Sequence, residues 1–73
     1  MLNLSKRLKL LRESKSLTQK QLAKILGVTE VSIQRFEYGT SRPNLDKIAF
    51  LADYFDVSLD YLVGRSDNPK INK

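Results

Sequence analysis

Apolar side chains recur along the chain at intervals of three and four residues, the spacing that places them on one face of an α-helix. Leu4, Leu8 and Leu11 form the first such stripe and predict a helix over about residues 4–14. The same periodicity predicts four further helices, over about 18–26, 29–38, 44–55 and 58–64. Their expected inward residues are Leu22, Ala23, Leu26, Ile33, Phe36, Leu45, Ile48, Leu51, Ala52 and Phe55.

Residues with the chemistry of helix caps stand at the ends of these segments. Thr18 and Gln21 have the spacing of a capping box, in which each side chain accepts the backbone N–H of the other residue. Gly27 suits the left-handed residue that ends the second helix. We expect an all-α fold, with one domain over residues 1–66 and a flexible polar tail over 67–73. The other expected caps are Thr29, Asn44 and Ser58 at helix starts and Gly39, Asp56 and Gly64 at helix ends.

The composition narrows the classes of function. The chain has 73 residues, 41% of them hydrophobic, which is enough for one small core. It contains no cysteine and no histidine, which excludes disulfides, thiol nucleophiles, histidine acid–base pairs and the usual zinc sites. We therefore expect no enzyme, cofactor, metal site or small-molecule substrate. Because no apolar run approaches the roughly 20 residues of a membrane span, and the N-terminus lacks a signal-peptide core, we expect a soluble, cytoplasmic protein.

The net charge of +5 is unevenly distributed. Residues 1–43 carry nine basic and three acidic side chains, whereas residues 44–64 carry one basic and four acidic side chains. A basic face suits phosphate binding, since neutralising phosphates releases condensed counterions. Ordinary solubilising charge would give the same total, so charge alone does not decide between nucleic-acid binding and a solvated surface.

The second and third predicted helices have the features of a helix-turn-helix, from about Thr18 to Glu37. This motif needs a small residue where the helices cross, a turn residue for the tight bend, and apolar residues aimed back at the first helix. Ala23, Gly27 and Ile33 meet these needs, and Val28 fills the turn. A plain αα-hairpin that only builds core remains the alternative interpretation of these four residues.

A wider set of residues resembles the phage repressor and Cro type (XRE-type, lambda-repressor-like) helix-turn-helix family. The resemblance covers about residues 4–64 and implies five helices, two-fold dimeric binding to operator DNA and regulation of transcription. Residues 57–62 are similar to the last helix of that family. The resemblance rests on Leu17-Thr18-Gln19, Leu22-Ala23, Leu26-Gly27-Val28-Thr29, Ser32-Ile33, Phe36-Glu37, Gly39 and Arg42-Pro43.

The resemblance implies that the start of the third helix faces base edges in the major groove. Arg35 has the chemistry for a bidentate contact with guanine, Val31 for packing on thymine methyl groups, and Glu30 for accepting from cytosine. An equally supported alternative is that the Glu30 carboxylate only stabilises the positive N-terminal end of its own helix. The other expected base-contacting residues are Thr29, Ser32 and Gln34.

Phosphate contacts are expected from the segments that flank the groove. The resemblance places a phosphate-binding glutamine at Gln19, where helix N-terminal N–H groups assist it. Alternatively, Gln19 only caps its helix and the other residues only form an ordinary solvated loop. The other expected phosphate contacts are Thr18, Lys20, Thr40, Ser41 and Arg42.

The resemblance also assigns Arg12 and Glu37 to the fold and not to DNA. It implies a buried or half-buried ion pair that ties the first helix to the end of the recognition helix. Ser16 departs from the family where a glycine often ends the first helix, so we expect that turn to be slightly strained or differently capped. Asn44 follows Pro43 where some relatives have a basic residue, which makes a minor-groove arginine contact doubtful.

The acidic end is expected to form a dimer interface. A core of this size cannot also bury the apolar surface of Leu59, Tyr61, Val63 and Phe50. Exposed apolar clusters on small proteins often bind a partner. The sequence therefore indicates a homodimeric repressor of prophage or mobile-element type that binds a near-palindromic double-stranded operator. A protein-interaction module, such as an antitoxin or antirepressor, is the alternative.

Overall fold

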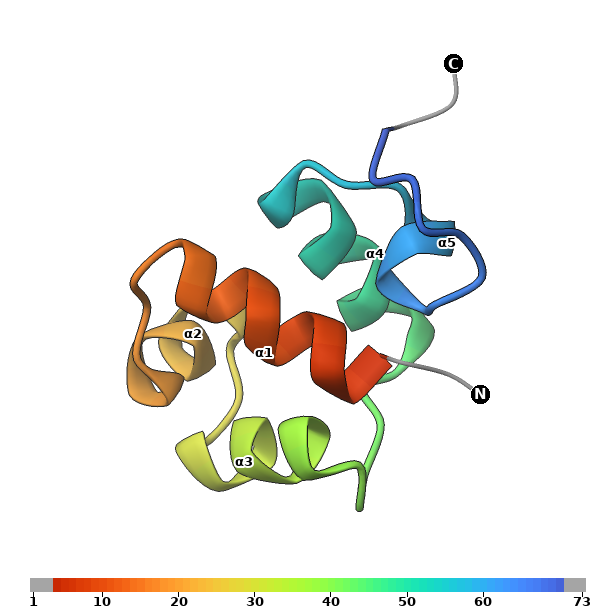
Figure 1. Ribbon diagram of the computed structural model, residues 1–73. Coiled ribbons are helices and arrows are strands. Elements are labelled where there is room, and N and C mark those ends of the chain that lie inside the picture. The colour runs from red at the N-terminus through yellow and green to blue at the C-terminus, as the bar shows by residue number, and fades with distance from the viewer. Residues whose placement is uncertain (1–3, 71–73) are drawn as a thin grey trace.

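The computed structural model describes residues 4–70, and this part of the chain contains five α-helices and no strand (Figure 1). The predicted all-α fold is therefore confirmed. None of these helices is long and apolar enough to cross a membrane. The predictions for residues 1–3 and 71–73 lie outside the described residues. The helices are α1 (Leu4–Ser14), α2 (Gln19–Leu26), α3 (Glu30–Tyr38), α4 (Leu45–Phe55) and α5 (Leu59–Leu62).

The helix α1 crosses the molecule between two pairs of helices (Figure 1). It packs against α3 on one side and against α5 on the other, while α2 contacts both α3 and α4. The result is a compact body with principal extents of 32 × 22 × 21 Å. The α2–α3 pair lies on one side of α1, and α4 and α5 lie on the other (Figure 1).

Each of the five helices contributes one side chain with no exposed surface to the core. These are Leu8, Leu22, Ile33, Leu51 and Leu62. Full burial of such a side chain contributes about 1.5–3 kcal/mol, so the core holds every helix to the others. The remaining buried apolar residues surround them and are Leu4, Ala23, Leu26, Phe36, Ala52, Phe55 and Val57.

One predicted core residue is on the surface. Leu45 was expected to point inward, but it is 70% exposed. It is the first residue of α4, and side chains on a helix lean toward the N-terminus, so Leu45 projects beyond the part of α4 that Leu51 and Ala52 bury. The apolar stripe of α4 therefore begins later in the chain than the sequence pattern predicts.

Local hydrogen bonds form the predicted helix ends. The Thr18 hydroxyl accepts from the Gln21 N–H at 3.0 Å and the Gln21 side-chain Oε1 accepts from the Thr18 N–H at 2.8 Å, which completes the capping box. Ser16 and Asp56 both have positive φ, 56° and 57°. For Ser16 this is the strained conformation that the sequence predicts. The helix α5 ends at Leu62, earlier than expected.

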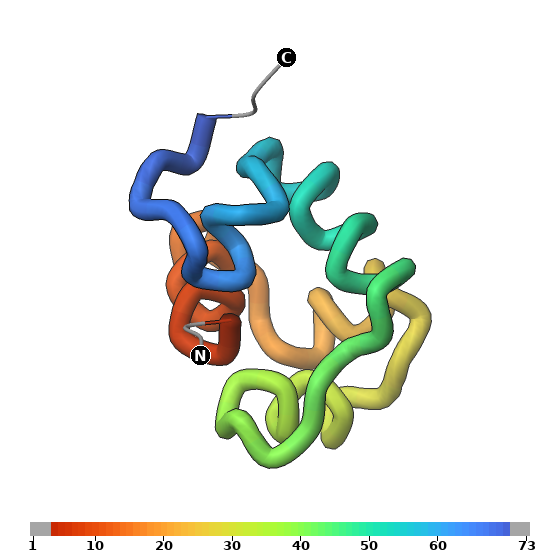
Figure 2. Tube along the Cα trace, turned by 90° about the vertical axis from the view of Figure 1, so that its right-hand side faces the viewer, coloured from red at the N-terminus to blue at the C-terminus, as the bar shows by residue number. Residues whose placement is uncertain are grey.

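The segment after α5 contacts other parts of the fold. Residues 65–69, called the strap below, lie against α5 and α1 (Figures 1 and 2). The Ser58 N–H donates to the Pro69 carbonyl at 2.8 Å, and Arg7 forms an ion pair with Asp67 at 2.7 Å. Residues 67–69, the first part of the predicted tail, therefore contact distant parts of the chain.

Candidate nucleic-acid interface

The turn between α2 and α3 is closed by backbone geometry. Gly27 has φ 78°, and both its N–H and that of Val28 donate to the Ala23 carbonyl, at 2.9 and 3.0 Å. A Cβ on Gly27 would meet nothing within 4 Å, so glycine is needed for its positive φ and not for space. Thr29 then caps α3 by accepting from the Ser32 N–H at 3.1 Å. These contacts fix the direction in which α3 leaves α2.

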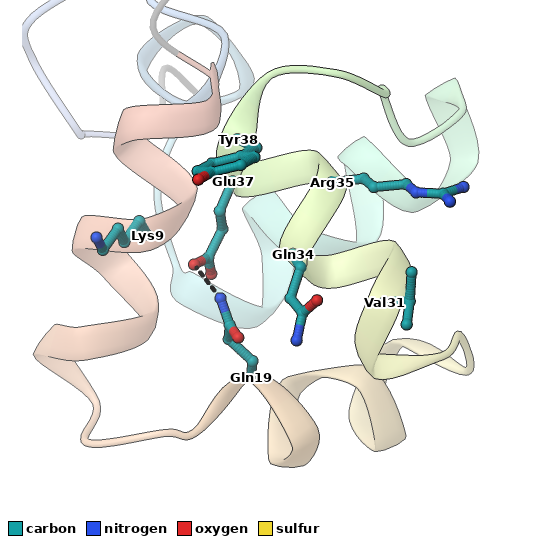
Figure 3. A pocket seen from close by; sticks show the side chains of 7 residues that line it. All are labelled: Lys9, Gln19, Val31, Gln34, Arg35, Glu37 and Tyr38. Atoms are coloured by element: carbon teal, nitrogen blue, oxygen red, sulfur yellow. Dashed lines mark hydrogen bonds between the residues drawn. The ribbon is translucent and has the colours of Figure 1, made fainter.

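The helix α3 has one buried face and one exposed face. Ile33 and Phe36 are buried, whereas Val31 is 50% exposed and Gln34 and Arg35 are also exposed. Figure 3 shows Val31 and Arg35 projecting from the same side of α3. Within residues 4–70 the Arg35 guanidinium forms no hydrogen bond or ion pair with another side chain, so its donors are open to solvent.

A hollow of about 420 Å³ lies beside this exposed face, between α1, the start of α2 and α3 (Figure 3). Two of its lining residues, Lys9 and Tyr38, were not among the sequence-predicted contacts. Lys9 belongs to a basic run in α1, which was the available signal, but only packing shows that α1 borders this hollow. The lining residues are Lys9, Gln19, Val31, Gln34, Arg35, Glu37 and Tyr38.

Arg12 and Glu37 form an ion pair that joins α1 to the end of α3. Arg12 Nε donates to Glu37 Oε2 at 2.6 Å and Nη2 donates to Oε1 at 3.1 Å. The two side chains are only 10% and 4% exposed. The hydrogen bonds to Glu37 raise the pKa of the Arg12 guanidinium above its ordinary value, against the opposing effect of burial. Arg12 Nη1 also donates to the Leu17 carbonyl at 2.7 Å, so the same side chain holds the turn before α2.

The same carboxylate holds Gln19. The Gln19 side-chain amide donates to Glu37 Oε1 at 3.1 Å, which is the dashed line in Figure 3. This contact orients the Gln19 side chain and leaves its carbonyl oxygen and second amide hydrogen for another partner. Gln19 and Lys20 are the first residues of α2, and N–H groups in that position have no partner within their own helix. The start of α2 therefore presents several donors next to the hollow.

The other predicted contacts lie at the two ends of this surface. Thr29 and Ser32 bond each other through their hydroxyl groups at 3.0 Å, as part of the α3 cap. Glu30 is exposed in the first turn of α3. Thr18 and Lys20 are exposed at the start of α2, and the remaining predicted phosphate contacts lie in the loop after α3. Those exposed residues are Thr40, Ser41 and Arg42.

The three residues expected at a dimer interface differ in exposure. Leu59 is 42% exposed, but Tyr61 and Val63 are each half-buried. Tyr61 packs against the core, and the guanidinium of Arg7 lies 4.2 Å from the centre of its ring. Phe50 is 44% exposed on α4 and stacks with Tyr54.

Comparison with known proteins assigns the chain to a family. A family model described as "Helix-turn-helix" matches residues 8–62. The uncharacterized HTH-type transcriptional regulator YobD of Bacillus subtilis is 41% identical over 63 residues, covering 86% of this chain and 56% of that protein. Antitoxin PezA of Streptococcus pneumoniae is 36% identical over 61 residues, covering 84% of this chain and 39% of that protein. The chain spans about half the length of the first curated relatives that it matches.

A solved structure shares the fold. The crystal structure of the P22 c2 repressor in complex with a synthetic operator matches with a TM-score of 0.76 and 28% sequence identity, covering 82% of this chain and 91% of that one. The names of these relatives are those of regulators, an antitoxin and a repressor. The resemblance to the XRE-type family drawn from the sequence is thus confirmed, and the chain belongs to the helix-turn-helix family.

Proposed function

We propose that this chain binds double-stranded DNA sequence-specifically and regulates transcription, acting as a repressor on a near-palindromic operator. The observation that carries the proposal is the exposed face of α3, where Val31, Gln34 and Arg35 project from a helix whose other face is fully buried. The likeness to a repressor bound to a synthetic operator supports the same conclusion.

In this proposal α3 lies in the major groove and its exposed side chains contact base edges. The solvent-facing Arg35 guanidinium donates to guanine O6 and N7, and the Gln34 amide suits adenine N6 and N7. Val31 packs on thymine methyl groups. Glu30 either accepts from cytosine N4 or stabilises the start of α3. Thr29 and Ser32 lie at the start of α3, where they bond each other in the cap. They contact bases at the edge of the surface.

Phosphates are contacted on both sides of α3. On one side the Gln19 side chain, oriented by Glu37, and the free N–H groups at the start of α2 bind one phosphate, with Thr18 and Lys20 beside them. On the other side the loop after α3 supplies the remaining contacts. These come from Thr40, Ser41 and Arg42.

A homodimer completes the proposal. Leu59, with Tyr61 and Val63, forms the contact between two copies across a two-fold axis. Such an axis sets the two α3 helices about 34 Å apart, one turn of B-DNA, and this spacing requires a near-palindromic site.

The test combines selection of bound sequences from random DNA with fluorescence-anisotropy titrations of the selected site. Arg35→Ala is expected to weaken binding to the selected site by about 1–3 kcal/mol, with a smaller loss on random DNA. Arg65→Ala is the matched control, because it removes the same charge from an exposed position on the strap. An equal loss on selected and random DNA for Arg35→Ala would rule out base reading by this residue.

The likeness to PezA supports an alternative function, that of a protein-interaction module such as an antitoxin. Salt distinguishes the two functions. DNA binding through six or more phosphate contacts falls by about 10³-fold or more between 50 and 200 mM salt, because bound counterions are no longer released as favourably. Failure to select any sequence, at any salt concentration, would favour the interaction module.

A further inference from the structure

A second hollow lies between α4 and the start of α5. It is a groove of about 370 Å³. Its apolar lining combines the buried Ala52 and Val57 with the exposed Ala49 and with Leu59, which is 42% exposed. Because the α2–α3 pair lies on the opposite side of α1, a molecule in this groove leaves the exposed face of α3 free (Figure 1).

Short side chains and local hydrogen bonds form the groove. The helix α4 presents two alanines, Ala49 and Ala52, to this space. The Val57 N–H donates to the Ala52 carbonyl at 3.0 Å and closes the turn between the two helices. The Ser58 hydroxyl then accepts from the Tyr61 N–H at 3.0 Å and caps α5. The walls are therefore formed before any partner arrives, which lowers the entropy cost of binding.

Carboxylates stand on both helices that line the groove. Asp53 comes from α4 and Asp60 from α5, and both side chains are exposed. Within residues 4–70 neither carboxylate forms an ion pair, and no lysine or arginine of this part of the chain lines the groove. The net charge of the whole chain is +5, so the groove has a local charge opposite to that of the molecule. An apolar lining between two carboxylates complements an apolar side chain flanked by cations.

We propose that this groove binds a partner protein through a basic amphipathic segment. An aliphatic side chain of the partner packs between Ala49 and Leu59, and its flanking lysines or arginines contact Asp53 and Asp60. A helix supplies this arrangement, because residues three and four apart share one face. A second copy fits the groove itself less well, since its own carboxylates would lie beside those of the first copy. Leu59 also belongs to the proposed dimer surface, so a bound partner competes with dimer formation.

Selection from a library of random peptides of about 15 residues, long enough to form a helix, tests the proposal on the full chain without DNA. The net charge of +5 attracts acidic peptides to the protein in general. The groove instead selects peptides with lysine or arginine three or four residues to either side of leucine, isoleucine or methionine. Enrichment of such basic peptides supports the proposal. Enrichment of acidic peptides alone, or of none, overturns it.

Titrations of the most enriched peptide, labelled for fluorescence anisotropy, locate its site. Asp53→Asn and Asp60→Asn should each weaken binding about threefold, and Ala49→Leu should weaken it by filling the groove without changing charge. Asp46→Asn is the matched control, because Asp46, like Asp60, is exposed in the first turn of its helix but does not line the groove. An equal loss in this control, or unchanged binding to Ala49→Leu, overturns the proposal. Since no DNA is present, failure to bind an operator would defeat the proposed function but would not change this comparison.

Discussion

Two arginines of α1 each bind a carboxylate from a distant part of the chain, and the two pairs differ in their surroundings. Arg12 meets Glu37 of α3, and both side chains are nearly buried, at 10% and 4% exposure. Arg7 meets Asp67 of the strap, whose side chain is 99% exposed. The first pair joins two helices of the proposed DNA-binding surface. The second joins α1 to a segment without regular secondary structure.

The difference shows how burial changes the role of one kind of ion pair. A buried charge that loses its partner cannot regain the hydration that it lost on folding, so the Arg12–Glu37 pair holds its helices together firmly. The Asp67 carboxylate is already in water and loses little when Arg7 leaves, so the Arg7–Asp67 contact adds little stability. The buried pair therefore contributes more to the stability of the fold than the exposed pair does.

The largest expected effect comes from removing one partner of the buried pair. Glu37→Ala leaves the Arg12 guanidinium buried without its carboxylate and should lower the free energy of unfolding by about 3–5 kcal/mol. Glu13→Ala is the control, because Glu13 lies 4.0 Å from Arg12 but its side chain is 57% exposed. Urea unfolding followed by circular dichroism measures both. Equal stability of the two variants would mean that burial does not distinguish these contacts.

A smaller effect is expected from keeping the charge of Arg12 but changing its shape. Arg12→Lys retains the cation but cannot make the bonds to Glu37 Oε1, Glu37 Oε2 and the Leu17 carbonyl together. We expect a loss of about 2 kcal/mol in the same unfolding measurement. A lysine variant as stable as the unaltered chain would show that charge alone, and not the planar arrangement of donors, holds this end of α3.

The turn beside the buried pair should gain stability when its strain is removed. Ser16 has φ 56°, and Ser16→Gly should stabilise the chain by about 0.5–1 kcal/mol, because glycine adopts this conformation without steric cost. Ser14→Gly, within α1, is the control and should instead destabilise it. The melting temperatures of the two variants should therefore move in opposite directions from that of the unaltered chain.

The smallest effect is expected at the exposed pair. Asp67→Asn removes the charge of a carboxylate that is already in water, so the melting temperature should stay almost unchanged. Any difference should disappear at 1 M salt, where exposed charges are screened over about 3 Å. A large loss of stability at low salt would contradict the contrast drawn between the two arginines.

Most of the fold was predictable because it depends on neighbours in the sequence. The caps and turns at Thr18, Gly27 and Asn44 bond residues three or four positions away, and such bonds are readable from residue type and spacing. Leu45 shows the limit of this method. Its place in the periodic pattern is correct, but the first turn of α4 extends past the core, which no local pattern records.

The candidate site was predicted less completely. The sequence and its family resemblance indicated Arg35, Val31 and Gln19, and the structure brings these residues to one surface. The bond from Gln19 to Glu37 and the presence of Lys9 and Tyr38 beside the same hollow were not predicted. These features depend on the angle at which α1 packs against α3, and this angle is set by the whole core.

The sequence by itself therefore determined the five helices, most of their caps and the helix-turn-helix that joins α2 to α3, since each depends on interactions within a few residues. Tertiary structure alone decided what the two arginines of α1 do. Arg7 and Arg12 lie in the same helix with the same chemistry, but their partners are 60 and 25 residues away in the chain. Packing buries one of those partners and leaves the other in water, and this difference separates a strong contact from a weak one.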